Sequence, residues 1–209
     1  MKSPLEDTIW GAEYGSVAAV QAAFDRFGPE YHKAILATGV PEGAARALFP
    51  HIETEAQGID LGCGSGVLGL ALREAGLPKP LDGVDLSPVM LELARKTGCY
   101  RDLQKANLLL PDECGGMARP YDFVITVGLI GDYVPYYVAL PYLVSLLRPG
   151  GFAGFAVEPR STPWAPLGKL AGELDLTLLS EAILPVPEGK LNEENYHFFV
   201  ARRADQPAG

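Results

Sequence analysis

The chain has 209 residues, of which 48% are hydrophobic and 21% charged; these values fit one soluble globular domain and exclude a disordered, collagen-like or coiled-coil chain. The formal net charge of −9 argues against nucleic acids and anionic membranes as partners, because both bind basic surfaces. No apolar run reaches the roughly 20 residues that a membrane span needs.

Cysteine usage and the N-terminal segment predict a cytoplasmic protein. Cys63, Cys99 and Cys114 are an odd number of cysteines at unrelated spacings, which fits neither a disulfide framework nor a metal site. Residues 1–8 are polar and lack the apolar segment of a signal peptide. We therefore expect reduced cysteines, no bound metal and a location in the cytosol.

Residues 1–55 are predicted to form a helical cap on a core of residues 56–204. Aromatic and valine side chains recur in the cap at spacings of three and four, which places them on one helical face. They are Trp10, Tyr14, Val17, Val20, Phe24, Phe27 and Tyr31. The Gly28–Pro29 pair interrupts this pattern, and a second helix is predicted from Pro41 toward Glu55. The aromatic face either packs on the core or forms a lid over a ligand.

The core alternates apolar strands with helical patterns, which predicts a parallel sheet covered by helices on both faces. The predicted strands are 57–61, 81–85, 102–108, 121–127 and 152–157, and the predicted helices are 67–75, 88–97 and 135–147. A short helix over 166–174 then precedes two strands, 176–186 and 196–203, with a turn-rich segment at 188–195 between them. Two consecutive strands without a crossover helix predict an antiparallel hairpin.

A glycine-rich turn between the first predicted strand and its helix is the strongest local signal. Its sequence over residues 59–66 is Ile-Asp-Leu-Gly-Cys-Gly-Ser-Gly. Glycines there permit a tight turn and the close approach of a ligand, and the amides that begin the helix favour an anionic group. Gly64, Gly66 and Gly69 also have the spacing of the dinucleotide-binding fingerprint, which alone has low specificity.

Asp85 ends the second predicted strand, about 20 residues after the glycine turn. A carboxylate at this place can accept hydrogen bonds from both ribose hydroxyls of a nucleoside. Sites for NAD and for S-adenosylmethionine both use such a residue, so Asp85 indicates a nucleoside without specifying which one. Its structural alternative is an aspartate that caps a surface turn.

Several segments, in the same order along the chain, resemble the motifs of class I S-adenosylmethionine-dependent methyltransferases. The acidic residue and glycines of the first motif are matched by Asp60, Gly62, Gly64 and Gly66. Residues 81–95 resemble the second block, 121–125 the fourth strand and 147–151 the turn into the fifth strand. Residues 24–31 and 99–103 further resemble small methyltransferase-like proteins related to the Williams–Beuren-region methyltransferase.

The resemblance implies a three-layer, Rossmann-like α/β fold with a seven-stranded, mostly parallel sheet. Its strand order would be 3-2-1-4-5-7-6, with strand 7 antiparallel. S-adenosylmethionine would lie across the carboxyl ends of strands 1, 2 and 4 and leave as S-adenosylhomocysteine. A short-chain dehydrogenase is disfavoured, because no tyrosine in the chain has a lysine four residues later.

The resemblance also assigns residues to the cofactor site. They are Tyr31, Asp60, Gly62, Cys63, Gly64, Gly66, Asp85, Leu86, Met90, Asn107, Leu108, Val127 and Gly128. Asp85 would hold the ribose, and Leu86 and Met90 would enclose the adenine, although Met90 fits the core equally well. Asn107 stands where the family usually has an aspartate, and it would accept the adenine amine through its carbonyl oxygen.

The sulfonium is already activated, so methyl transfer needs alignment and exclusion of water, and a base only if the acceptor loses a proton. The main candidate catalytic residues are Asp132, Tyr133 and His32, with Glu158 as a further candidate. We expect a small organic acceptor, methylated on O or N as in secondary metabolism, and a monomer or homodimer. Two alternatives stay open: a cyclisation or rearrangement on the same fold, and a catalytically inactive cofactor-binding protein.

Overall fold

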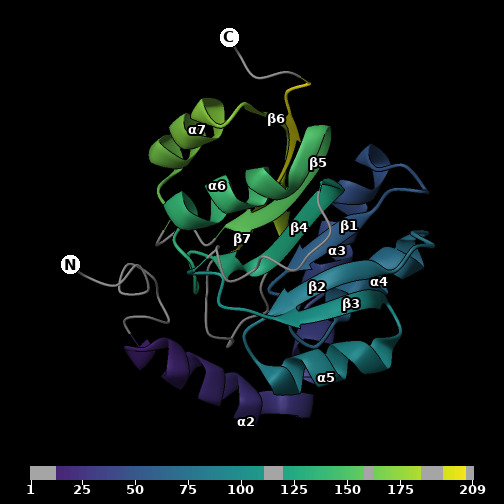
Figure 1. Ribbon diagram of the computed structural model, residues 1–209, viewed down its shortest axis with the longest axis vertical. Coiled ribbons are helices and arrows are strands. Elements are labelled where there is room, and N and C mark those ends of the chain that lie inside the picture. The colour runs from purple at the N-terminus through teal and green to yellow at the C-terminus, as the bar shows by residue number, and fades with distance from the viewer. Residues whose placement is uncertain (1–12, 111–119, 158–161, 185–194, 206–209) are drawn as a thin grey trace.

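The computed structural model describes residues 13–110, 120–157, 162–184 and 195–205. Predictions for Trp10, Cys114, Glu158 and most of the turn at 188–195 lie outside these residues. Within the described residues, a single sheet lies between two layers of helices (Figure 1). None of the helices in these ranges is both long and apolar enough to cross a membrane.

Seven strands form the sheet in the order β3-β2-β1-β4-β5-β7-β6. They are β1 (Gly58–Leu61), β2 (Leu81–Asp85), β3 (Tyr100–Lys105), β4 (Tyr121–Ile130), β5 (Leu147–Val157), β6 (Leu176–Leu184) and β7 (Tyr196–Arg203). The pairs from β3 to β5 are parallel, and β7 runs antiparallel to both β5 and β6. The predicted fold class and strand order are confirmed.

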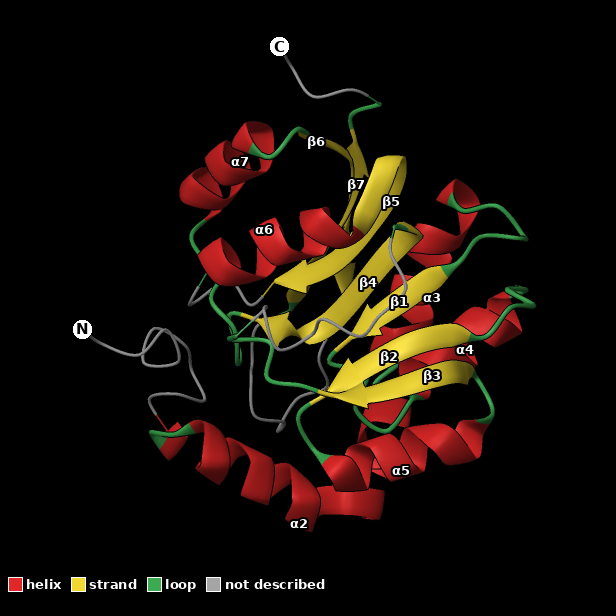
Figure 2. Cartoon of the chain, viewed as in Figure 1, coloured by secondary structure: helices red, strands yellow, loops and turns green. Residues whose placement is uncertain are grey.

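Helices cover both faces of this sheet (Figure 2). They are α2 (Val17–Leu36), α3 (Val40–Leu48), α4 (Val67–Ala75), α5 (Pro88–Thr97), α6 (Tyr136–Leu146) and α7 (Trp164–Glu173), with a short 3-10 helix, η2 (Phe49–His51). Leu48 of α3 and Leu72 of α4 belong to the apolar core on one face. Leu140 of α6 and Leu167 of α7 belong to the core on the other face. This layering leaves the carboxyl ends of the parallel strands available for a site.

The N-terminal helices differ in part from their prediction. The helix predicted from Pro41 toward Glu55 ends at Leu48 and gives way to η2, because Pro50 lacks the N–H that a continuing α-helix requires. The predicted interruption at Gly28 is a bend inside α2, where the glycine has φ 35° and ψ −120°.

Three strand boundaries were also wrong. The third strand covers Tyr100–Lys105 rather than 102–108, because the chain turns at Asn107, whose side-chain oxygen accepts the Leu109 N–H. β4 continues to Ile130, and β5 begins at Leu147. Leu147 pairs with Tyr121 ahead of a register shift, so the proline and glycines that suggested a turn are absorbed into the strand as an irregularity.

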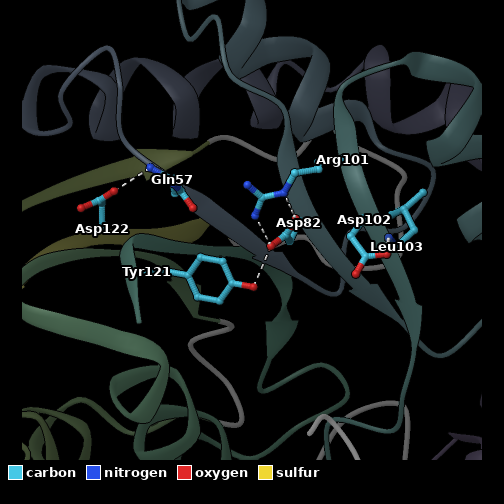
Figure 3. Close-up of polar contacts among 7 residues, drawn as sticks. All are labelled: Gln57, Asp82, Arg101, Asp102, Leu103, Tyr121 and Asp122. Atoms are coloured by element: carbon cyan, nitrogen blue, oxygen red, sulfur yellow. Dashed lines mark hydrogen bonds and ion pairs between the residues drawn. The ribbon is translucent and has the colours of Figure 1, made fainter. Parts of the chain in front are cut away.

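A buried carboxylate in β2 links this strand to its neighbour β3 and to β4, which lies beyond β1 in the sheet (Figure 3). Asp82 is 2% exposed and accepts two hydrogen bonds from the Arg101 guanidinium of β3, at 3.0 and 2.6 Å. The Tyr121 hydroxyl of β4 donates to the same carboxylate at 2.8 Å. Every acceptor oxygen of Asp82 is therefore paired, as a buried charge requires.

We expect Tyr121→Phe to lower the free energy of unfolding by about 1 kcal/mol, the usual net contribution of one hydrogen bond. The loss stays small because Arg101 still pairs with both oxygens of Asp82. Urea denaturation measures the change as a shift in midpoint at constant slope. A midpoint equal to that of the wild type would show that this hydroxyl does not stabilise the fold.

Candidate functional site

A cavity lies between α2 and the loops that follow β1, β2, β3 and β4. The space between its lining atoms is about 720 Å³, a value that includes space open to solvent. The predicted site residues in its lining are Tyr31, Gly62, Gly64, Asp85, Leu86, Asn107, Leu108, Val127, Gly128 and Tyr133. The other lining residues are Val17, Val20, Gln21, Phe24, Ser87, Ala106, Leu109, Leu129 and Val134.

The glycine turn is held against β2 by backbone hydrogen bonds. The N–H groups of Gly62 and Cys63 both donate to the Val84 carbonyl, at 2.8 and 2.9 Å. The Gly64 N–H donates to Asp85 Oδ2 at 2.8 Å. Gly64 has φ +51°, and a Cβ atom placed on it would have only Tyr31 Cε1, 3.9 Å away, within reach. The missing side chain at Gly64 therefore leaves open space in the cavity.

The next two glycines along the chain, at the start of α4, serve packing instead. A Cβ atom on Gly66 would come within 2.9 Å of the Ala94 Cα in α5. A Cβ atom on Gly69 would come within 2.8 Å of the Tyr100 hydroxyl in β3. The dinucleotide-like spacing of these glycines thus has a structural cause in the contacts of α4 with α5 and β3.

Asp85 lines the cavity and also fixes the loops beside it. Its carboxylate accepts the Gly64 N–H at 2.8 Å and the Ser87 N–H at 2.8 Å. Burial raises the pKa of Asp85 to about 6, an effect that these backbone donors partly oppose and that the nearby Asp25 carboxylate reinforces. The Leu86 N–H also donates to this carboxylate, so the three backbone donors leave one of its four lone pairs for a ligand hydroxyl.

Asp60 lies beneath the glycine turn and is not part of the cavity lining. It is 1% exposed and accepts a hydrogen bond from the Tyr100 hydroxyl at 2.8 Å. Burial raises the pKa of Asp60 to about 7, while the Tyr100 hydrogen bond lowers it and Asp85 raises it. Two carboxyl groups thus flank the turn.

One of the amides expected to favour an anion at the start of α4 is already engaged. The Gly69 N–H, the third amide of α4, already donates to the Tyr100 hydroxyl at 3.3 Å. Among the described residues that line the cavity there is no lysine, arginine or histidine, whereas Asp85 supplies negative charge. These features suit a cationic ligand better than a pyrophosphate.

Three more predicted cofactor residues lie behind the lining. Cys63 is 4% exposed and packs with Leu91 and Ala94 of α5. Met90 is fully buried, and Gly66 is buried at the start of α4. Asn107 does line the cavity, but its carbonyl oxygen already accepts the Leu109 N–H at 3.1 Å.

The three main catalytic candidates have different surroundings. Tyr133 lines the cavity, and burial raises its pKa well above the ordinary value. Asp132 is 1% exposed and outside the lining, where its carboxylate accepts the Tyr196 hydroxyl at 2.9 Å. His32 is also outside the lining, and its buried Nδ1 has no hydrogen-bond partner among the described residues.

Helix α2 forms one wall of the cavity through Val17, Val20, Gln21, Phe24 and Tyr31. The Phe24 ring packs edge-on against the rings of Tyr31 and Tyr133, each with a centroid distance of 5.3 Å. The Ser87 hydroxyl also ties α2 to the β2 loop by donating to Asp25 at 2.5 Å. The aromatic face of α2 therefore packs on the core through Tyr133 and also lines the cavity.

Sequence reasoning missed several residues of this site. Gln21 lies on the predicted cap helix, but its polarity excluded it from the apolar pattern. Ser87, which is the N-cap of α5 and accepts the Met90 N–H at 3.1 Å, was not predicted to line a cavity. Tyr196 begins β7 far along the chain, and no local pattern connects it with Asp132.

Comparison with known proteins agrees with this fold. Residues 59–151 match a family model described as a methyltransferase domain. The structure of a TehB-like SAM-dependent methyltransferase from Corynebacterium glutamicum superimposes with a TM-score of 0.66 at 18% identity, covering 87% of this chain and 98% of that one. Residues 59–151 are thus similar to a methyltransferase domain, and the chain shares its fold with a SAM-dependent methyltransferase.

Two curated relatives are more similar in sequence but match only in part. Human methyltransferase-like protein 27 is 32% identical over 147 residues, covering 66% of this chain and 58% of the human protein. Ribosomal protein L11 methyltransferase of Burkholderia ambifaria is 33% identical over 93 residues, covering 44% of this chain and 29% of that enzyme. The chain thus spans less than two thirds of the length of either relative.

Proposed function

We propose that the protein transfers the methyl group of S-adenosylmethionine to an oxygen or nitrogen of a small, largely apolar molecule, as in secondary metabolism. The glycine turn beside Asp85, inside the segment that matches a methyltransferase domain, carries the cofactor part of the proposal. The apolar wall that α2 contributes supports the acceptor part. The cap over residues 1–55 and the core over 56–204 would then divide acceptor and cofactor binding between them.

In this proposal the cofactor lies along the carboxyl ends of β1, β2 and β4. The Asp85 carboxylate accepts hydrogen bonds from the ribose hydroxyls, and Gly62 and Gly64 lie against the methionine portion. The adenine is enclosed by Leu86, Asn107 and Leu108, and the sulfur lies near Val127 and Gly128, with Tyr31 above. Asp60, Cys63, Gly66 and Met90 act from behind the lining, by fixing the shape of the turn and of α5.

S-adenosylmethionine supplies an activated methyl group, so the chain's own residues align the acceptor and exclude water. A tyrosine hydroxyl is protonated near neutral pH, and burial raises the pKa of Tyr133 further, so its hydroxyl donates a hydrogen bond to the acceptor. Asp132, held in place by Tyr196, and His32 stay candidate bases for an acceptor that loses a proton, but both lie outside the cavity lining. Of the three candidates, only Tyr133 lies where it can contact the acceptor directly.

A transfer assay with methyl-labelled cofactor tests the proposal. The mixtures contain the full chain with neutral phenols, with amines of similar size, or with purified ribosomal protein L11, because a relative acts on that protein. We expect label in the small-molecule fraction and none in the protein. Label in L11 instead would contradict the small-molecule acceptor, and cofactor that binds but keeps its label in every mixture would favour cyclisation or an inactive binding protein.

Three finer points belong to the same proposal. We place the protein in the cytosol, where its two described cysteines, both buried and free, would stay reduced. We take it to act as a monomer or homodimer without nucleic-acid or membrane partners. The kinship with the Williams–Beuren-region group rests on residues 24–31 and 99–103, and a phylogeny of full-length sequences tests it.

A further inference from the structure

The Tyr100 ring fills a slot that three glycines leave open beneath the glycine turn. A Cβ atom on Gly66 would approach Tyr100 Cε2 within 3.0 Å, and one on Gly83 would approach Cδ1 within 2.8 Å. At Gly69 the corresponding contact is with the hydroxyl oxygen, also at 2.8 Å. Glycines on α4 and β2 thus surround one aromatic ring from β3, which fixes where its hydroxyl lies.

That hydroxyl makes two hydrogen bonds, one as donor and one as acceptor. It donates to Asp60 Oδ2 at 2.8 Å and accepts the Gly69 N–H at 3.3 Å. The N-cap of α4 is Gly66, which has no side chain to satisfy the first amides of the helix. Gly69 is the third residue of α4, and its amide is the one that a serine or threonine N-cap would normally satisfy. Tyr100 therefore caps α4 from a different strand.

We propose that Tyr100 is a positioning residue for the cofactor turn: its hydroxyl joins the start of α4 to Asp60 and so holds residues 62–66 in their binding conformation. The capping of α4 by Tyr100 is independent of any ligand, whereas its effect on cofactor affinity rests on the proposed function. Tyr100 does not line the cavity, so it acts only through the turn.

The test uses Tyr100→Phe, which keeps the ring in its slot and removes only the hydroxyl. Tyr121→Phe is the matched control, because it also deletes a buried hydroxyl that donates to an aspartate at 2.8 Å, away from the cavity lining. We expect the dissociation constant for S-adenosylmethionine to rise about five- to tenfold in Tyr100→Phe and less than twofold in Tyr121→Phe. Calorimetry on the full-length proteins measures both.

A pH series separates positioning from a general loss of stability. The titratable groups that face Asp60 among the described residues are Tyr100 from β3, Asp85 from β2 and Cys63 in the turn. We expect affinity for the cationic cofactor to rise with pH as Asp60 ionises. The Tyr100 hydrogen bond lowers the pKa of Asp60, so Tyr100→Phe shifts this rise in affinity to higher pH. The ligand's own titration is the same for each protein, so it cancels from the ratio of the variant and wild-type dissociation constants. In an Asp60→Asn background the same substitution causes no such movement.

Amide exchange of Gly69 in the cofactor-free protein, followed by NMR, tests only whether Tyr100 caps α4. We expect Tyr100→Phe to accelerate this exchange at least tenfold while Tyr121→Phe leaves it unchanged. Unaltered Gly69 exchange, or an affinity within twofold of wild type at every pH, overturns the inference. Wild-type protein that binds no S-adenosylmethionine overturns the proposed function instead, and the Gly69 amide still decides whether Tyr100 caps α4.

Discussion

Gly64→Val is expected to abolish binding of S-adenosylmethionine while the fold survives. A Cβ atom at this position would point into the cavity toward Tyr31, with no other atom within 4 Å, so a valine side chain occupies ligand space without striking the core. The left-handed backbone, with φ +51°, adds strain of roughly 1–2 kcal/mol. Calorimetric titration measures binding, and circular dichroism verifies the fold.

Gly39→Val separates the steric effect from backbone strain. Gly39 has φ +71°, and a Cβ atom on it would have no other atom within 4 Å. It lies at the start of α3, outside the cavity lining. We expect Gly39→Val to lose similar stability and to keep wild-type affinity. Retained affinity in Gly64→Val would show that the turn is not where the cofactor binds.

Asp85→Ala is expected to weaken cofactor binding by about 1–3 kcal/mol, or roughly 5- to 150-fold. The substitution removes the acceptor proposed for the ribose hydroxyls and also releases the Gly64 N–H that Asp85 holds. Asp102→Ala is the control, since that exposed aspartate also accepts a backbone N–H but does not line the cavity. Equal dissociation constants for wild type and Asp85→Ala would remove Asp85 from the site.

The same variant carries a pH signature. The pKa of Asp85 is raised to about 6 by burial, and hydroxyl donors on a bound ligand favour its ionised form. Wild-type affinity should therefore fall as the pH drops through 6, because the proton must first leave the carboxyl group. Asp85→Ala should lose this component of the pH dependence and keep the component that belongs to Asp60.

Local patterns predicted the elements that carry strong periodicity or clear caps. Helix α5 begins at Pro88 after its Ser87 cap and β2 ends at Asp85, as expected. The third strand was misplaced because β3 is an edge strand with only partly buried or exposed side chains, so its apolar alternation is weak. The strand order came from the resemblance to a family and not from periodicity.

The site was predictable where a residue's position in a strand or turn determines its place. Gly64 follows β1 and Asp85 ends the adjacent parallel strand β2, so their location at the carboxyl ends was visible in the sequence. The contacts of Tyr100 with Asp60 and of Tyr196 with Asp132 join segments far apart in the chain. Such pairs depend on how strands and helices pack in three dimensions, and no local pattern encodes them.

The most direct measurement is a crystal structure of the full chain grown with saturating S-adenosylhomocysteine. We predict ribose hydroxyls within hydrogen-bond distance of the Asp85 carboxylate, with the homocysteine chain lying against Gly62 and Gly64. A cavity that stays empty at saturation, or a ligand bound away from these residues, would contradict the assignment of this turn as the cofactor site.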